Sequence, residues 1–297
     1  MPRPSIINLP DGVRVAVEDA VGSMLRSASV GGGDVSSAAR VEGERGSVFV
    51  KWGATGHSYA AEAEGLGALA GAAGPGVAVP APLAVVAPAG GAPGGLVLPW
   101  IERGRPGPED WRRFGAALAE LHRAPAPGDG AYGWETDNWI GSKPQRNGWN
   151  PSWPAFFGER RLRAQARLVA ARGAWNVRWD RPLDRLIARL PEILPDTPAP
   201  SLLHGDLWSG NALATVGGRF ALIDPAVSVG HREADLAMTE LFGGFAPAFY
   251  DGYGEAWPLD AGYPARREVY TLFHLINHLT HGPSYRRPVE AALRPFM

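Results

Sequence analysis

The stretch that decides the fold is His204-Gly205-Asp206-Leu207-Trp208-Ser209-Gly210-Asn211, and Ile223-Asp224-Pro225 follows it downstream. Asn211 stands five residues after Asp206, and Asp224 stands eighteen after it. Between them, residues 211–215 and 219–223 predict two strands joined at Gly217-Gly218 as a tight hairpin. Such a hairpin would bring together two carboxylates and an amide oxygen, which are the hard ligands that Mg²⁺ prefers.

This spacing matches the loop of protein kinases, in which one Asp accepts the proton of the acceptor hydroxyl. An Asn and a second Asp downstream hold the metal ions. Gly205 stands where protein kinases have Arg, and Pro225 replaces Phe-Gly, as is typical of small-molecule kinases with this fold. A lone His-Gly-Asp would most often be a hydrogen-bonded loop, but the complete motif is far more specific. We therefore predict Asp206 as the base and Asn211 and Asp224 as the Mg²⁺ ligands.

A phosphate-binding lysine is expected upstream. Only two of the 29 basic residues are lysine, Lys51 and Lys143, and Lys51 closes the predicted strand Val48-Phe49-Val50-Lys51. That is where kinases carry the lysine that pairs with the ATP phosphates, and a compact ammonium is not interchangeable with a guanidinium there. The following helix, predicted over residues 57–70, offers Glu62 and Glu64 as partners for this lysine. No role follows from the sequence for Lys143.

The remaining ATP contacts are expected from backbone groups. Gly31-Gly32-Gly33 precedes the strands, and we predict that Gly32 and Gly33 approach the nucleotide phosphates, although the run does not spell G-x-G-x-x-G. The joint Leu98-Pro99-Trp100-Ile101 would receive adenine, through the carbonyl of Pro99 and the N–H of Ile101.

The organisation predicted is α+β in two lobes. Residues 1–101 form a small nucleotide-binding lobe of antiparallel strands and one helix, with a hairpin that turns at Glu44-Arg45-Gly46. Residues 102–297 form a larger and mainly helical catalytic and substrate lobe. Helices are expected over residues 109–123, 153–172, 183–190, 233–241, 246–255 and 265–281. In the basic helix 153–172, the arginines at 160, 161, 163 and 167 are expected to form a solvated face.

Composition excludes several classes of function. A net charge of −1 over 297 residues argues against nucleic-acid binding. The absence of cysteine excludes disulfides, including a disulfide-linked dimer, and thiolate or Cys-zinc chemistry. The most apolar stretch, residues 76–98, holds four prolines and does not predict a membrane helix, and residues 1–12 do not resemble a secretory signal. A cytoplasmic protein without a membrane partner is therefore expected.

Taken together, the chain resembles the fructosamine kinase (ketosamine 3-kinase) family, whose relatives include the aminoglycoside and choline phosphotransferases. The resemblance runs over nearly the whole length, and its motifs are Gly31-Gly32-Gly33, Phe49-Val50-Lys51, Glu62-x-x-x-Leu66, Asn138-Trp139-Ile140-Gly141 with Pro144-Gln145-x-Asn147-x-Trp149, the loop 204–211, Asp224-Pro225-Ala226, Gly230-His231-Arg232-Glu233, and His274 with Asn277-His278.

The resemblance implies a protein-kinase-like fold and ATP- and Mg²⁺-dependent phosphorylation of the 3-hydroxyl of ketosamines. The acceptors would be small ketosamines or glycated protein lysines, so the activity would be a deglycation repair. By motif, Glu62 is the partner of Lys51, and Trp208, Glu233 and His278 are expected at the substrate site. Some relatives carry a cysteine in the glycine-rich loop, whereas Asp34 follows Gly33 here, so the oligomeric state is open.

Two alternatives remain open at this point. The chain could be a phosphotransferase for another alcohol, such as an aminoglycoside, choline or a homoserine-like compound. It could also be a non-catalytic nucleotide-binding protein with the kinase fold, although a scaffold does not need Lys51, Asp206, Asn211 and Asp224 together.

Overall fold

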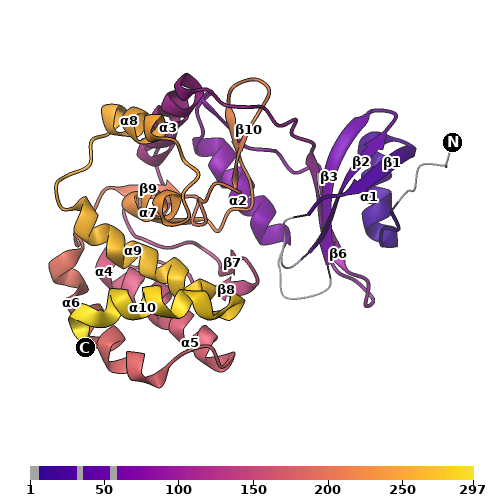
Figure 1. Cartoon of the computed structure of the whole chain (residues 1–297). Helices are drawn as coiled ribbons and strands as arrows, with labels where there is room; N and C mark the ends of the chain where they lie inside the picture. The colour runs from indigo at the N-terminus through magenta and orange to yellow at the C-terminus, as the bar shows by residue number, and fades with distance from the viewer. Residues whose placement is uncertain (1–6, 32–35, 54–58) are drawn as a thin grey trace.

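The computed structural model describes residues 7–31, 36–53 and 59–297, which form a smaller and a larger part (Figure 1). The smaller part is built on five antiparallel strands in the order β1-β2-β3-β6-β5. The expected hairpin is confirmed, since the second and third strands pair from Ser37 opposite Trp52 to Gly43 opposite Gly46. The strands are β1 (Met24–Ser29), β2 (Ser37–Gly43), β3 (Gly46–Gly53), β5 (Ala84–Val86) and β6 (Gly94–Pro99).

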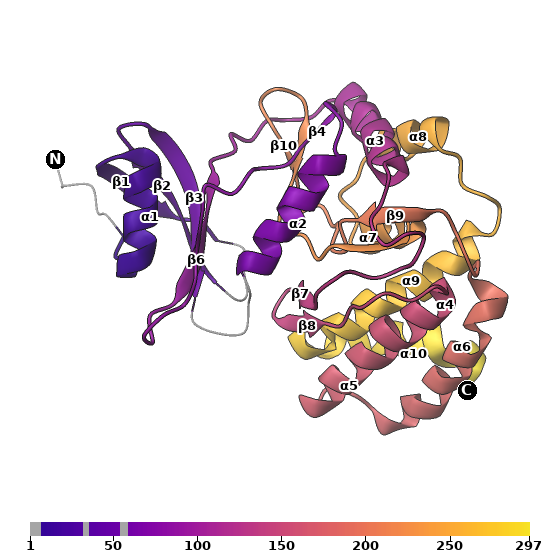
Figure 2. The ribbon, with the colours of Figure 1, turned by 180° about the vertical axis from the view of Figure 1, so that it is seen from behind.

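Two helices, α1 (Asp11–Val21) and α2 (Tyr59–Ala72), cover opposite faces of this sheet (Figures 1 and 2). The alternation of side chains along β6 explains the arrangement. Val97 packs in one apolar cluster with the valines of α1. Leu96 and Leu98 point the other way and pack with Tyr59 and Leu66 of α2. Each face of the sheet therefore has its own core.

The larger part is mainly helical, as expected. Its α-helices are α3 (Pro108–Arg123), α4 (Trp153–Phe156), α5 (Ala164–Ala171), α6 (Asp180–Ile193), α7 (Glu233–Leu241), α8 (Pro247–Ala256), α9 (Tyr263–His278) and α10 (Arg286–Leu293). They enclose two apolar cores. One surrounds Phe114 of α3 and Phe249 of α8, and the other surrounds Trp153 and Tyr270.

Short strands carry the motif loops between these two cores. Strand β9 (Pro200–Leu203) pairs with β12 (Ser228–His231), and β7 (Asn138–Ile140) pairs with β8 (Lys143–Gln145). The predicted hairpin is β10 (Ala212–Ala214) with β11 (Phe220–Leu222). Strand β4 (Val77–Ala78) pairs in parallel with β11, so a segment that precedes residue 101 packs in the core of the larger part. The boundary between residues 101 and 102 stays a prediction.

The sequence did not predict α1, because only one helix was expected in the first hundred residues. Its buried stripe is Val13, Val17 and Val21, at the spacing of one helix face. Valine is β-branched and a weak helix former, so local propensity gives little signal. Packing of these valines on the sheet stabilises the helix instead.

The expected helix 153–172 is present but its middle has a different winding. Residues Phe157–Arg163 form a π-helix between α4 and α5. The expectation of a solvated arginine face is wrong for Arg161, which is buried and donates hydrogen bonds to the carbonyl of Arg146 at 2.6 Å and to Oδ1 of Asn147 at 2.8 Å. Such a turn re-aims side chains within a helix, and here it directs a guanidinium inward.

Within the described residues, no helix is both long enough and apolar enough to cross a membrane.

Candidate active site

The expected lysine lies between two carboxylates. Lys51 stands opposite Leu96 in the β3–β6 pairing, so its side chain leaves the sheet on the face that α2 covers. Its Nζ lies 2.5 Å from Oε1 of Glu62 and 2.5 Å from Oδ1 of Asp224. Burial by itself lowers the pKa of Lys51, but the charges of Asp224 and Glu62 outweigh burial and raise it, so the ammonium stays charged.

Asp235, in the first turn of α7, accepts hydrogen bonds from the backbone of the loop that follows β9. Its Oδ2 accepts a hydrogen bond from the backbone N–H of His204 at 2.7 Å, and its Oδ1 accepts one from Gly205 at 2.9 Å. The ring of His122 contacts the same carboxylate at 3.3 Å, and its other nitrogen contacts the hydroxyl of Tyr253 at 2.9 Å. Nothing in the sequence pointed to His122 or Tyr253 as partners of this carboxylate.

Neutral His204 joins the loop of residues 204–211 to the segment Ile223-Asp224-Pro225; these are called the two motif loops below. Its Nε2 lies 2.9 Å from the carbonyl of Ile223 and its Nδ1 lies 3.2 Å from the N–H of Asp206. Because a carbonyl only accepts and an N–H only donates, the proton is on Nε2. Burial lowers the pKa of His204, which keeps the ring neutral.

Gly205 is required at its position. Its φ is 81°, in the left-handed region, and a Cβ there would lie 2.0 Å from the carbonyl oxygen of Ala226. The loop that carries Asp206 therefore lies so close to the segment after Asp224 that a side chain at position 205 would clash with it.

Asp206 and Asn211 are brought together as the spacing predicted. Nδ2 of Asn211 donates to the backbone carbonyl of Asp206 at 2.8 Å and to its Oδ2 at 3.2 Å. The enclosing protein and the charge of Asp224 raise the pKa of Asp206 to about 7, against the hydrogen bond from Asn211. Its carboxyl is thus poised near neutrality, which suits a general base.

The donor set fits one Mg²⁺ that is shared with a ligand. The amide hydrogens of Asn211 face Asp206, so the amide oxygen Oδ1 of Asn211 points away from Asp206. One oxygen of Asp224 binds Lys51, and 47% of the Asp224 side chain is exposed. The described residues contain no group of three His, Asp or Glu side chains that could hold a metal by themselves. Two protein oxygens suit an ion that completes its shell with phosphate and water.

The predicted adenine contacts lie where β6 leaves the small sheet. Pro99 is the last residue of β6, and Ile101 follows Trp100, whose N–H donates to the carbonyl of Ser47 at 3.2 Å. Gly32 and Gly33 lie outside the described residues. These four ATP-binding assignments stay predictions.

Two of the residues expected at the substrate site are accessible. Trp208 follows Asp206 in the loop and is 38% exposed. His278 is half-buried at the end of α9, and its ring centroid lies 4.9 Å from Phe242 and 5.2 Å from Tyr285.

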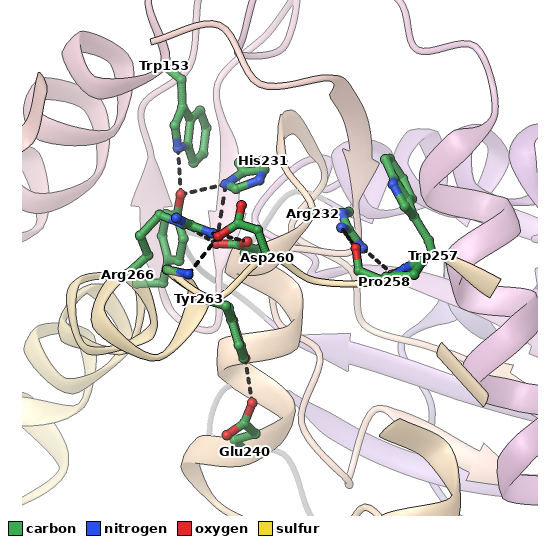
Figure 3. A network of polar contacts seen from close by, with 12 residues as sticks. Trp153, His231, Arg232, Glu240, Trp257, Pro258, Asp260, Tyr263 and Arg266 are labelled. Carbon is green, nitrogen blue, oxygen red and sulfur yellow. Dashed lines mark hydrogen bonds and ion pairs between the residues drawn. The ribbon is translucent and has the colours of Figure 1, made fainter. Parts of the chain in front are cut away.

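The structure corrects the expectation for Glu233. Its side chain is 1% exposed, and Arg266 contacts both carboxylate oxygens at 2.6 Å. Figure 3 shows Arg266 in the surrounding network, beside Asp260. A buried carboxylate with a bidentate partner stabilises the start of α7 and presents nothing to a substrate.

Comparison with known proteins decides the family. The model of the fructosamine kinase family matches residues 15–296. The chain belongs to the fructosamine kinase family. Among its relatives, a provisionally named ketoamine kinase of Synechocystis sp. is 41% identical over 269 residues, which are 90% of this chain and 88% of that protein. The chloroplastic protein-ribulosamine 3-kinase of Oryza sativa subsp. indica is 36% identical over 91% of this chain and 78% of its own length.

Solved structures agree with this family and with the expected fold. A provisionally named fructosamine-3-kinase of Thermobifida fusca YX-ER1 superposes with a TM-score of 0.84 at 31% identity, over 97% of this chain and 98% of that one. A thermostable mutant of the aminoglycoside phosphotransferase APH(4)-Ia shares the fold, with a TM-score of 0.65 at 14% identity over 95% of this chain and 99% of that one. The two-lobed kinase-like fold predicted from the sequence is confirmed.

The role of Asp235 can be tested through the pH dependence of stability. Burial raises the pKa of Asp235, but the hydrogen bond and charge of His122 and the backbone N–H groups outweigh burial and lower it below 3.8. A depressed carboxyl pKa stabilises the fold above the unfolded pKa, and this contribution is lost as the pH falls through the folded pKa. We expect Asp235→Asn to lower the free energy of unfolding by about 1–3 kcal/mol at neutral pH.

The difference between Asp235→Asn and the unaltered protein should shrink as the pH falls below 3.8. Urea unfolding followed by circular dichroism at several pH values measures it. A difference that stays constant down to acid pH would contradict the assignment of Asp235 as a charged brace.

Proposed function

We propose that this protein transfers the γ-phosphoryl group of ATP to the 3-hydroxyl of ketosamines, the rearranged adducts of sugars with amines. The observation that carries the proposal is the pairing of Lys51 with Glu62 and Asp224, beside Asp206 and Asn211. A kinase needs these groups together, and here they occur in a chain of the fructosamine kinase family. Relatives that are named ketoamine and protein-ribulosamine kinases support the substrate class.

Each side chain of the site has a separate role in the proposed reaction. The ammonium of Lys51 would bind the ATP phosphates, and Glu62 holds that ammonium in place. The carboxylate of Asp206 would orient the acceptor hydroxyl and accept its proton. Catalysis of this kind depends on positioning and on fixed charges, so the bracing of the Asp206 loop by Asp235 serves it directly.

We propose that Asn211 and Asp224 hold Mg²⁺, through the amide oxygen of the first and a carboxylate oxygen of the second. The bound ion would neutralise charge on the phosphates. Lys51 and the ion would then share Asp224, which requires the carboxylate to be ionised. The surrounding protein atoms raise the pKa of Asp224, but the charge of Lys51 and its hydrogen bond outweigh them and lower it, so the ionised form is the stable one.

The acceptor is proposed to lie against Trp208 and the group of rings formed by Phe242, His278 and Tyr285. Phe242 is 39% exposed and Trp208 38%, so aromatic surface is accessible next to the loop of Asp206. The segment after Phe242 lies on that loop, because a Cβ at Gly244 would meet the side chain of Ser209 at 2.6 Å. Aromatic faces suit both a sugar and the cationic amine of a ketosamine.

A panel of acceptors tests the substrate class. We expect ATP consumption with ribulosyl-lysine, fructosyl-lysine or a glycated protein, and none above background with choline or hygromycin B. Phosphate incorporation at the sugar 3-hydroxyl, detected by mass spectrometry and NMR, completes the measurement. Turnover of an aminoglycoside or choline in place of every ketosamine would overturn the proposal, and ATP binding without turnover of any alcohol would favour a non-catalytic protein.

Replacement of the proposed base, Asp206, should strongly reduce turnover and leave the fold intact. We expect Asp206→Asn to lower kcat by about 10²- to 10⁴-fold, because the amide cannot accept the proton. Its circular dichroism spectrum should match that of the unaltered protein. Asp184→Asn, which changes an exposed carboxylate on α6, is the matched control and should retain its kcat. Near-normal turnover in Asp206→Asn would exclude Asp206 as the base.

An arginine at position 51 keeps the positive charge, but it should not replace the function of Lys51. We expect Lys51→Arg to lose most activity, at least about tenfold in kcat/KM for ATP, because a planar guanidinium does not fit between Glu62 and Asp224 as an ammonium does. Initial rates over a range of ATP concentrations measure the effect. Full activity would show that this position needs only a positive charge.

A further inference from the structure

Helices α3 and α8 lie side by side in the larger part, and their backbones touch at two glycines (Figures 1 and 2). A Cβ at Gly115 of α3 would lie 1.9 Å from the carbonyl oxygen of Phe249. A Cβ at Gly252 of α8 would lie 2.0 Å from the carbonyl oxygen of Arg112. Because backbone meets backbone at both points, the separation and the register of the two helices are fixed.

This packing brings a tyrosine of α8 to a histidine of α3. Tyr253 follows Gly252, and both its side chain and that of His122 are buried. The hydroxyl of Tyr253 lies 2.9 Å from Nδ1 of His122, and the two rings meet edge to face with their centroids 5.8 Å apart. The guanidinium of Arg232 lies over the Tyr253 ring, 5.5 Å from its centroid. The place of the phenol ring is therefore held by contacts other than its hydroxyl.

The partners of His122 determine where its proton lies. Nε2 of His122 lies 3.3 Å from Oδ2 of Asp235, and an ionised carboxylate can only accept, so Nε2 carries a proton. In the neutral ring Nδ1 is then an acceptor, and the hydroxyl of Tyr253 donates to it. Only one orientation of the ring satisfies both neighbours, because a flip about the Cβ–Cγ bond would turn carbon atoms toward Tyr253 and Asp235.

The carboxylate of Asp235 binds the backbone of one of the two motif loops, the one that carries Asp206. Its Oδ2 accepts from the N–H of His204 as well as from His122, and its Oδ1 accepts from the N–H of Gly205. Donors from α3 and from the loop thus fix the carboxylate between them, and loss of the donor on α3 leaves it free to turn away from the loop. Asp206 follows Gly205 in the chain, so its position depends on this backbone.

We propose that Tyr253 is a positioning residue for phosphoryl transfer, which acts on the loop of Asp206 through His122 and Asp235. Its hydroxyl holds the His122 ring in the orientation in which the Nε2–H faces Asp235. This deepens the proposed function and rests on it. Because Tyr253 is buried against α3, it acts on the place of the base and not on ATP, so its effect falls on turnover and not on nucleotide binding by Lys51.

The kinetic test compares two tyrosines of the same helix. Tyr253→Phe removes the hydroxyl and keeps the ring, and we expect kcat with the best ketosamine to fall about fivefold or more, the scale of one lost hydrogen bond. The KM for ATP should change by less than about twofold. Tyr250→Phe makes the same change one turn earlier, where the hydroxyl lies 3.2 Å from Oγ1 of Thr239, and it should retain its kcat. In a His122→Phe background, Tyr253→Phe should cause no further loss of kcat.

Two further measurements need no substrate. The first is hydrogen–deuterium exchange followed by mass spectrometry, which compares residues 204–211 with the β2–β3 hairpin of the smaller part. Tyr253→Phe should speed exchange in residues 204–211 by about threefold or more, because the amides of His204 and Gly205 lose a fixed acceptor. Exchange in the β2–β3 hairpin should not change, and Tyr250→Phe should alter neither segment.

The second measurement observes the ring nitrogens of histidine by NMR, with the signals of His122 assigned by their loss in His122→Phe. We expect Nε2 of His122 to carry the proton and Nδ1 to be an unprotonated acceptor. The Nδ1 signal should shift in Tyr253→Phe, because that nitrogen loses its hydrogen bond, and it should stay in place in Tyr250→Phe.

The outcomes separate this inference from the proposed function. An unchanged kcat in Tyr253→Phe, an equal loss in Tyr250→Phe, or a further loss in the His122→Phe background would overturn the inference. Exchange that is unchanged in residues 204–211, or equally faster in the β2–β3 hairpin, would overturn it too, as would a His122 ring protonated on both nitrogens. If the unaltered protein phosphorylates no ketosamine, the proposed function fails, and the exchange and NMR measurements still decide whether Tyr253 positions the loop.

Discussion

The buried ammonium of Lys51 is the interaction on which the rest of the site depends. It bonds Glu62, eleven residues away in the chain, and Asp224, 173 residues away, at 2.5 Å each. An ammonium removed from water is costly unless it is paired, so the fold gains only if all three groups arrive together. The smaller sheet, α2 and the loop after β11 are therefore positioned against one another by the same charge that would bind phosphate.

Buried polar groups in the larger part are likewise paired. Asp235 is buried with a charge, but the N–H groups of His204 and Gly205 and the ring of His122 satisfy it. His204 is buried without a charge and uses both ring nitrogens to join two loops. Polar groups thus replace apolar packing at the point where the two cores of this part meet, and their geometry, unlike that of packed side chains, is fixed by direction.

The sequence predicted the elements whose signal is local. The loop around Asp206, the β2–β3 hairpin and helix α7 were expected with nearly the bounds observed. Helix α1 was missed because its valines carry little helix propensity, and Arg161 was misplaced because a π-helix turns a residue inward that an α-helix would leave outside. Tyr253 and His122 have no spacing relation to Asp235, and only the packing of α8 on α3 brings them together. Contacts of this kind cannot be read from one sequence.

Strand β4 has a mechanical consequence. The chain passes from β4, which is paired with β11 in the larger part, to β5 in the small sheet, and it returns from β6 to the bridge between Arg103 and Thr215. Together with the passage from α2 to β4, the chain crosses between the small sheet with its helices and the larger part three times. These three connections limit the relative movement of the two parts, and the Lys51 ion pairs to Glu62 and Asp224 join the parts at a further point.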